Sequence, residues 1–256
     1  MPLDYALQLG ATLQAAAAGS VNQMVGTTQA DVFIEKLMVT SNVAGGLPGT
    51  LAARPSAITD ARVANQSLFT TNGVFPSSAL SPNAVNNSSA VVGVGLAAGT
   101  NVSVTVSPIG GTADISAAIG TDPVPPGIVP GEFALSQVAL LAGLGQGTDA
   151  AGVAGVIAAG AAWTSTTTVT RPCRLGRMFW DSDQNIEITS ILIAGSEQLA
   201  ANVGAIYVST FDFLATDEQG LSLDGIPVEA GSQIIISGTN NQAAPTTYAL
   251  GGIFCV

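Results

Sequence analysis

The sequence predicts an all-β protein made of two similar β-rich halves joined by a proline-rich segment. Short segments rich in β-branched residues alternate with Gly, Pro and Asn along most of the chain, as in strands separated by turns. Residues 122–130 hold four prolines in nine residues, which excludes a regular helix or a central strand there. Matching landmarks also recur at a nearly constant spacing in the two halves.

The N-terminal segment, residues 1–29, is predicted to be a helix or arm. Apolar residues recur in it at helical spacing around a run of alanines at 15–18, and alanine has the highest helix propensity. Asp4 stands where a secretion signal would carry positive charge, and glutamines interrupt the apolar stretch. We therefore expect no signal peptide.

Residues 30–121 are predicted to form the first β domain, because segments such as 32–39 and 101–106 are β-branched and often alternate. The proline-rich segment opens a linker, residues 122–162, in which 132–144 is predicted to be a short helix. Strand-like sequence resumes at Trp163 and continues through residues 163–256, the second β domain.

The second half contains eight candidate strands in fewer than 100 residues. Eight short strands joined by turn-forming loops are typical of a β-sandwich or jelly roll, which leaves few unpaired sheet edges. The sequence therefore predicts two tandem jelly-roll domains. The candidate strands are residues 166–170, 173–177, 178–180, 187–194, 205–211, 225–228, 233–237 and 247–255.

The landmarks indicate an internal duplication. Ile58-Thr59 recurs as Ile188-Thr189, Gly73 recurs as Gly204, and residues 98–101 recur as 230–233 in related form. The order is the same in both halves, and the offset drifts by only about two residues. A repeat of this length is a small domain, since the units of solenoids and propellers are about 20–50 residues long.

Charge is scarce in this chain. Only 9% of its residues are charged, against about 25% in an ordinary soluble domain. A surface so poor in charge disfavours a free monomer and favours a subunit covered by its neighbours. The net charge is −11, and no basic residue lies between Arg62 and Arg171, so we expect no strong direct binding to nucleic acid.

The duplicated β organisation, the size and the composition resemble the double jelly-roll major capsid proteins of tailless icosahedral viruses, including bacteriophages. The resemblance covers residues from about 30 to 256. It implies two upright jelly rolls in one chain, with three chains forming a pseudo-hexagonal block of the shell. The chain is small for that family, and a single jelly roll with long insertions is the alternative.

One segment has the start of a calcium-binding pattern. Asp181, Asp183 and Asn185 alternate as oxygen ligands do in a calcium loop. However, Ile186 replaces the glycine of an EF-hand loop and Leu192 replaces its bidentate glutamate. A polar turn between strands is the favoured interpretation, and a metal or cofactor is not expected.

The remaining motifs concern arginines and cysteines. Arg171, Arg174 and Arg177 are interpreted either as making local salt bridges or as bridging to acidic residues of a neighbouring subunit. Cys173 and Cys255 are expected on neighbouring strands of one sheet, in contact as free thiols rather than as a disulfide. The chain has no histidine, which excludes His-dependent catalysis and His-ligated metals. No catalytic or cofactor-binding residue is predicted.

These observations favour a structural virion protein that assembles with copies of itself into a homotrimer and a larger shell, inside the host cytoplasm. The expected partners are other copies, other virion proteins and an internal membrane reached through the N-terminal arm. The first alternative is a minor virion component such as a decoration, spike or receptor-binding protein. The second is an enzyme or carbohydrate-binding domain, which would need an acidic pocket.

Overall fold

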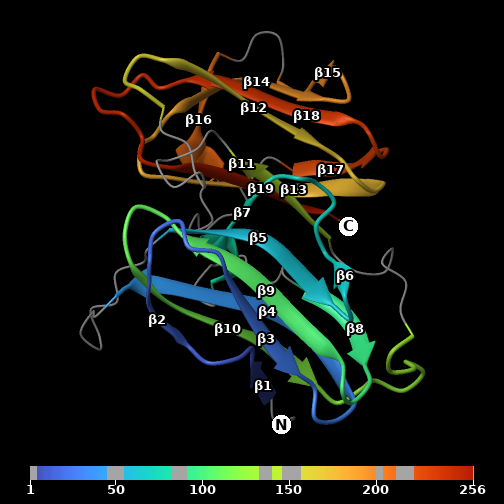
Figure 1. Cartoon of the computed structure of the whole chain (residues 1–256). Helices are drawn as coiled ribbons and strands as arrows, with labels where there is room; N and C mark the ends of the chain where they lie inside the picture. Colours follow the sequence, from blue (N-terminus) through green and yellow to red (C-terminus); the bar gives the residue numbers. More distant parts are fainter. Residues whose placement is uncertain are drawn as a thin grey trace. The chain divides into compact units, whose positions relative to one another are not determined.

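A computed structural model describes residues 5–44, 55–81, 91–132, 140–145, 157–199, 204–211 and 222–255 (Figure 1). The chain divides into two compact units. Unit 1 comprises Met1–Leu68, Ser77–Leu140 and Val256, and unit 2 comprises Phe69–Pro76 and Leu141–Cys255. The paired strands of both units are antiparallel, and the predicted all-β class is confirmed for the described residues.

Unit 1 contains two sheets that enclose an apolar core. Inward-facing residues alternate with outward-facing ones along its strands, so each sheet buries one face. Ile115 and Ile119 from one sheet and Val104 from the other are fully buried. The first sheet contains β1 (Tyr5–Gln8), β2 (Leu13–Ala16), β10 (Ala113–Asp122), β4 (Val32–Val43) and β8 (Val91–Leu96); the second contains β3 (Asn22–Thr27), β9 (Asn101–Pro108), β5 (Ser56–Val63) and β6 (Gln66–Ser67), and η1 (Ser77–Leu80) follows.

Unit 2 has the same two-sheet construction. Its core includes Trp163 and Trp180, whose ring centroids lie 5.5 Å apart. The first sheet contains β11 (Leu140–Gly145), β19 (Ala249–Cys255), β13 (Cys173–Ser182) and β17 (Ser222–Val228); the second contains β12 (Ala162–Thr168), β18 (Gln233–Thr239), β14 (Glu187–Ile193), β15 (Ser196–Glu197) and β16 (Ile206–Tyr207), with η4 (Val208–Phe211) after it.

The strand order identifies each unit as a jelly roll. In a jelly roll the first, eighth, third and sixth strands form one sheet, and the second, seventh, fourth and fifth form the other. Unit 1 follows this order as β1/β2-β10-β4-β8 and β3-β9-β5-β6. Unit 2 follows it as β11-β19-β13-β17 and β12-β18-β14-β15. The two tandem jelly rolls predicted from the sequence are present, and the alternative of a single jelly roll is not.

The duplication extends to irregular details of the backbone. Thr59 and Thr189 occupy the same β-bulge, where the register shifts by one residue on the fourth strand of each roll. The hydroxyl of Thr59 donates to the carbonyl of Thr105 at 3.4 Å, and that of Thr189 donates to the carbonyl of Ser237 at 3.2 Å. A shared bulge is a specific feature, because it inserts one residue at one position.

The turns repeat as well. Two-residue turns with positive φ at both positions, 64–65 and 194–195, join the fourth and fifth strands. Gly99 and Gly231 adopt φ values of 85° and 89° before the seventh strand, a conformation that favours glycine. Their N–H groups donate to the carbonyls of Thr28 and Val169, at 2.8 and 2.7 Å. The sequence landmarks therefore mark equivalent positions in two rolls.

The predicted N-terminal helix is wrong for the described residues. This segment forms β1, β2 and β3, which lie in both sheets of unit 1. The helical spacing of its apolar residues led to the wrong prediction, because residues with positive φ interrupt the segment. Ala15 has a φ of 49°, and Gly10 and Gly19 have φ values of 68° and 72°. In β3 the buried Met24 alternates with exposed neighbours, which is the pattern of a strand with one buried face.

The proline-rich segment lies in unit 1 and has a defined place. Gly131 donates its N–H to the carbonyl of Gly95 in β8 at 2.9 Å, and the Ile128 side chain lies against Gly95. Of the predicted helix at 132–144, residues 133–139 lie outside the described residues. The part from Leu140 onward forms strand β11, so the helix prediction is wrong there.

Unit 2 includes one segment from the first half of the sequence, Phe69–Pro76, which we call the inserted segment. The Thr71 hydroxyl accepts the N–H of Gly143 in β11 at 2.8 Å and donates to its carbonyl at 3.1 Å. Asn72 accepts hydrogen bonds from Thr167 and Thr168 of β12. The second jelly roll is thus completed by residues that precede it by about 70 positions or more.

Aromatic packing holds the inserted segment on the sheet of β13 and β19. The Phe75 ring lies 5.2 Å from that of Phe254, which lies 5.0 Å from Phe179. Gly252 leaves the space that the Phe75 ring occupies. All seven residues of β19 are buried, because the core covers one face of the strand and the inserted segment covers the other.

Candidate functional site

The calcium candidates lie at the end of β13 and in the loop after it, and their side chains bind residues outside this segment. The Asp183 carboxylate accepts the backbone N–H of Thr247 at 2.9 Å and its hydroxyl at 2.6 Å. Asp181 accepts the hydroxyl of Tyr248 at 3.1 Å, and the Asn185 amide oxygen accepts the N–H of Ser209. The three side chains therefore tie this loop to different neighbours, as expected of a polar turn. Among the described residues, no group of three or more Asp, Glu, Cys or His side chains is placed to hold a metal ion.

The three arginines do not converge on one ligand. The Arg171 guanidinium donates to the carbonyl of Phe69 at 2.8 Å, and its burial lowers its pKa. Arg174 is exposed and donates to the carbonyl of Gly225, and Arg177 lies beyond a register shift on β13. Arg171 thus helps to fix the inserted segment. Bridges from these arginines to a neighbouring subunit stay a prediction.

The cysteines lie together at one end of the sheet, as expected. Leu175 of β13 pairs with Cys255, so Cys173 lies diagonally across the two strands from Cys255. The Cys255 thiol donates to the carbonyl of Ile253 at 3.8 Å, and the Thr70 hydroxyl lies 3.6 Å from the Cys173 sulfur. Cys173 is half-buried and Cys255 is fully buried. Sequence reasoning missed Thr70, because it belongs to the inserted segment.

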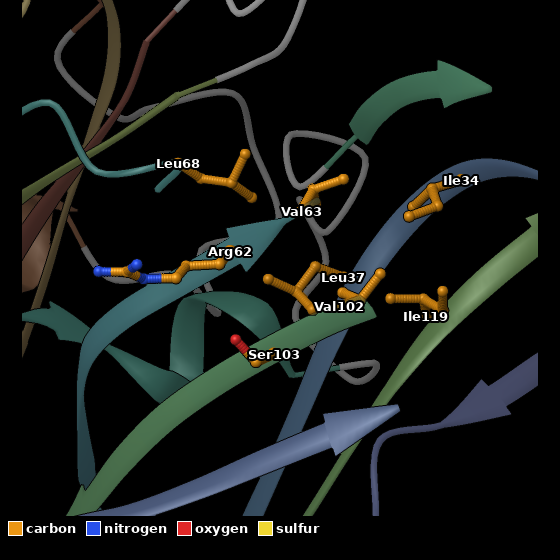
Figure 2. Close-up of a pocket in the computed structure, with 8 residues that line it drawn as sticks. All are labelled: Ile34, Leu37, Arg62, Val63, Leu68, Val102, Ser103 and Ile119. Atoms are coloured by element: carbon orange, nitrogen blue, oxygen red, sulfur yellow. The ribbon is translucent and has the colours of Figure 1, made fainter. Parts of the chain in front are cut away.

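One gap between the two sheets of unit 1 is too small to be a binding cavity. Figure 2 shows Ile34, Leu37 and Ile119 gathered between the two sheets, with Val102 beside them. The space that these side chains leave does not admit a water molecule. The gap is therefore a packing feature of the core.

A polar hollow of about 330 Å³ lies on the outer face of β3, β9 and β5. Val25, Ser103 and Arg62 are aligned across the three strands, and Asp60 pairs with Arg62 at 2.5 Å. The hollow is open and shallow, and the acidic side chain in it is already paired. This arrangement does not supply the pair of free carboxylates that most glycoside hydrolases use.

The corresponding face of unit 2 carries no charge at its centre. Strands β12 and β18 contain no charged residue, and their outward side chains are hydroxyls, aliphatic groups and the amide of Gln233. Thr166, Ile235 and Leu192 form one row across β12, β18 and β14. We call this surface the threonine face; a second row comprises Thr164, Ser237 and Ser190.

The outer face of the other sheet of unit 1 is similar at its centre. Met38 of β4 lies opposite Ala118 of β10, and Thr40 lies opposite Ser116. These four side chains are partly exposed, small or flexible, and uncharged. Such surfaces can pack against a neighbour without desolvating ionised groups, which is the composition found at the centres of protein interfaces.

Comparisons with known proteins find similarity among solved structures only. No family model matches the chain, and no curated protein matches it. Among solved structures, the chain is similar to the major capsid protein P2 of bacteriophage PM2, with a TM-score of 0.40 and 11% identity, over 99% of this chain and 96% of that one. Both the TM-score and the sequence identity are low, so the double jelly-roll assignment rests on the strand order described above.

No helix among the described residues is long and apolar enough to cross a membrane.

Proposed function

We propose that this chain is a structural, non-enzymatic subunit that assembles with copies of itself into a virus-like shell. The observation that carries the proposal is the presence, in one chain, of two complete jelly rolls, each with one outer sheet face that is uncharged at its centre. A jelly roll leaves few free sheet edges, so many copies can stand side by side without uncontrolled strand pairing. The uncharged faces then supply the contacts.

Trimers are the expected building block. Two similar rolls per chain place six similar units around the axis of a homotrimer, which gives a pseudo-hexagonal outline suited to a closed lattice. The low total charge of the chain supports this role, since a surface with 9% charged residues is tolerated when neighbours cover it. We propose assembly in the host cytoplasm and a final location in the virion.

Other partners are secondary in this proposal. The net charge of −11 supports the absence of strong direct contact with a nucleic acid. The described residues of the N-terminal segment belong to the sheets of unit 1, and a membrane contact through this arm stays a prediction. A minor virion component, such as a spike or decoration protein, is the alternative function.

Imaging of the protein expressed alone, together with its copy number in purified particles, tests the proposal. We expect negative-stain micrographs to show closed particles or sheets with hexagonal spacing, and a copy number in the hundreds per particle. Single globules at high protein concentration, together with only a few copies per particle, would favour the minor component instead.

A further inference from the structure

The strongest unassigned chemistry lies at the cysteine pair of unit 2. The half-buried Cys173 and the fully buried Cys255 come from neighbouring strands, β13 and β19. The Thr70 hydroxyl lies beside the Cys173 sulfur, and the Arg171 guanidinium is close enough to act on it electrostatically. A hydroxyl, a second thiol and a cation thus lie near one partly accessible sulfur.

This environment favours the thiolate of Cys173. Its pKa falls to about 7, first because of hydrogen bonding with the Cys255 side chain, and also because of Thr70 and Arg171. The pKa of Cys255 is raised by the same hydrogen bond and by burial. The two thiols therefore differ in role: the accessible one is ionised near neutral pH and the buried one holds its proton.

We propose that Cys173 and Cys255 form a thiol–disulfide exchange site, in which Cys173 attacks low-molecular-weight disulfides of the glutathione class and Cys255 resolves the product. This inference stands on unit 2 alone and does not depend on the shell-forming role.

The reaction balances in two steps. The Cys173 thiolate attacks one sulfur of glutathione disulfide; the disulfide bond of the reagent breaks, and one glutathione leaves as a thiolate that takes a proton from water. The Cys255 sulfur then attacks the Cys173 sulfur, and its proton passes to the second glutathione, which leaves as a thiol. Two protein thiols are oxidised, and one glutathione disulfide is reduced to two thiols.

The product links the start of β13 to the end of β19, strands that are neighbours in one sheet. A disulfide between Cys173 and Cys255 closes a long loop and so restricts the unfolded chain strongly. We therefore expect the melting temperature to rise by roughly 5–10 °C. Dithiothreitol should reverse the change by reducing the disulfide to two thiols.

The experiment treats the full chain with glutathione disulfide at pH 8 and follows mass and free thiols. Wild type should lose both thiols, retain no glutathione and melt at a higher temperature. Cys255→Ser should stop at a stable glutathione adduct on residue 173. Cys173→Ser should react much more slowly, since Cys255 is buried. A lasting adduct on wild type, or equal rates for Cys173→Ser and Cys255→Ser, would overturn the proposal.

A second measurement needs no cysteine variant. The rate at which iodoacetamide alkylates Cys173 in wild type, located by peptide mapping, should reach half its maximum near pH 7, against about pH 8.5 for an ordinary cysteine. Thr70→Val removes one donor to the sulfur, so its midpoint should move to higher pH. A wild-type midpoint at the ordinary value would contradict the site.

Discussion

Gly73→Ala is the substitution that tests the inserted segment most sharply. A Cβ atom at residue 73 would lie 2.0 Å from the carbonyl oxygen of Gly143, whereas ordinary contacts are longer than about 3.4 Å. The obstacle is backbone, and the Thr71 hydroxyl bonds to both the N–H and the carbonyl of Gly143. The two segments must therefore separate by more than about 1 Å. From the cost of overpacking we expect a loss of about 3 kcal/mol in the free energy of unfolding.

Urea denaturation and thermal melting followed by tryptophan fluorescence measure this loss. Trp163 and Trp180 both lie in unit 2, so the signal reports the affected roll, and its midpoint should fall by roughly 6–12 °C. Gly204→Ala is the matched control, because residue 204 is the counterpart of residue 73 in the repeat and no described atom lies within 4 Å of its Cβ position. Equal stability of the two variants would refute the assignment of the inserted segment to unit 2.

Three further predictions follow from the repeated details and from the loops. Thr59→Val and Thr189→Val each remove one hydroxyl donor from the same bulge, so each should cost about 0.5–1.5 kcal/mol in urea denaturation; a large difference between them would contradict their equivalence. The pKa of Glu197 is lowered, first by the Ser190 hydroxyl and then by backbone N–H groups, so this stabilisation is present above the ordinary Glu pKa and is lost as pH falls through the lowered one. Wild type should therefore lose more stability between pH 6 and pH 3 than Glu197→Gln. An equal loss in the free energy of unfolding for both proteins would contradict this prediction. Because the Asp183 carboxylate already accepts two donors, calcium should leave the melting temperature unchanged relative to an EDTA control, and a clear rise would establish a metal site.

The fold could be predicted where local pattern and long-range pairing agree. Runs of β-branched residues in segments such as β9 and β18 indicate strands, and turn residues such as Gly99 and Gly231 mark the same connection between the sixth and seventh strands in both rolls. The repeat can be recognised in the sequence because the shared β-bulge and the positive-φ turns accept few residue types. These constraints survive when the surrounding side chains differ.

Other features could not be predicted from local sequence. The N-terminal segment has helical spacing of apolar residues, but pairing of β1 and β2 with β10 decides its conformation. The inserted segment carried no local signal, because the space for Phe75 is made by Gly252, far along the chain. The same reason hid Thr70 from the cysteine pair, although Cys173 and Cys255 themselves were predicted to meet.

The mass of the purified full-length chain in solution tests the central claim most directly. Sedimentation velocity at micromolar concentration should show a trimer of the 25.4 kDa chain or a larger closed assembly, because the threonine face and the small, uncharged face of β4 and β10 need partners. A stable monomer under these conditions, with both jelly rolls folded, would contradict the account.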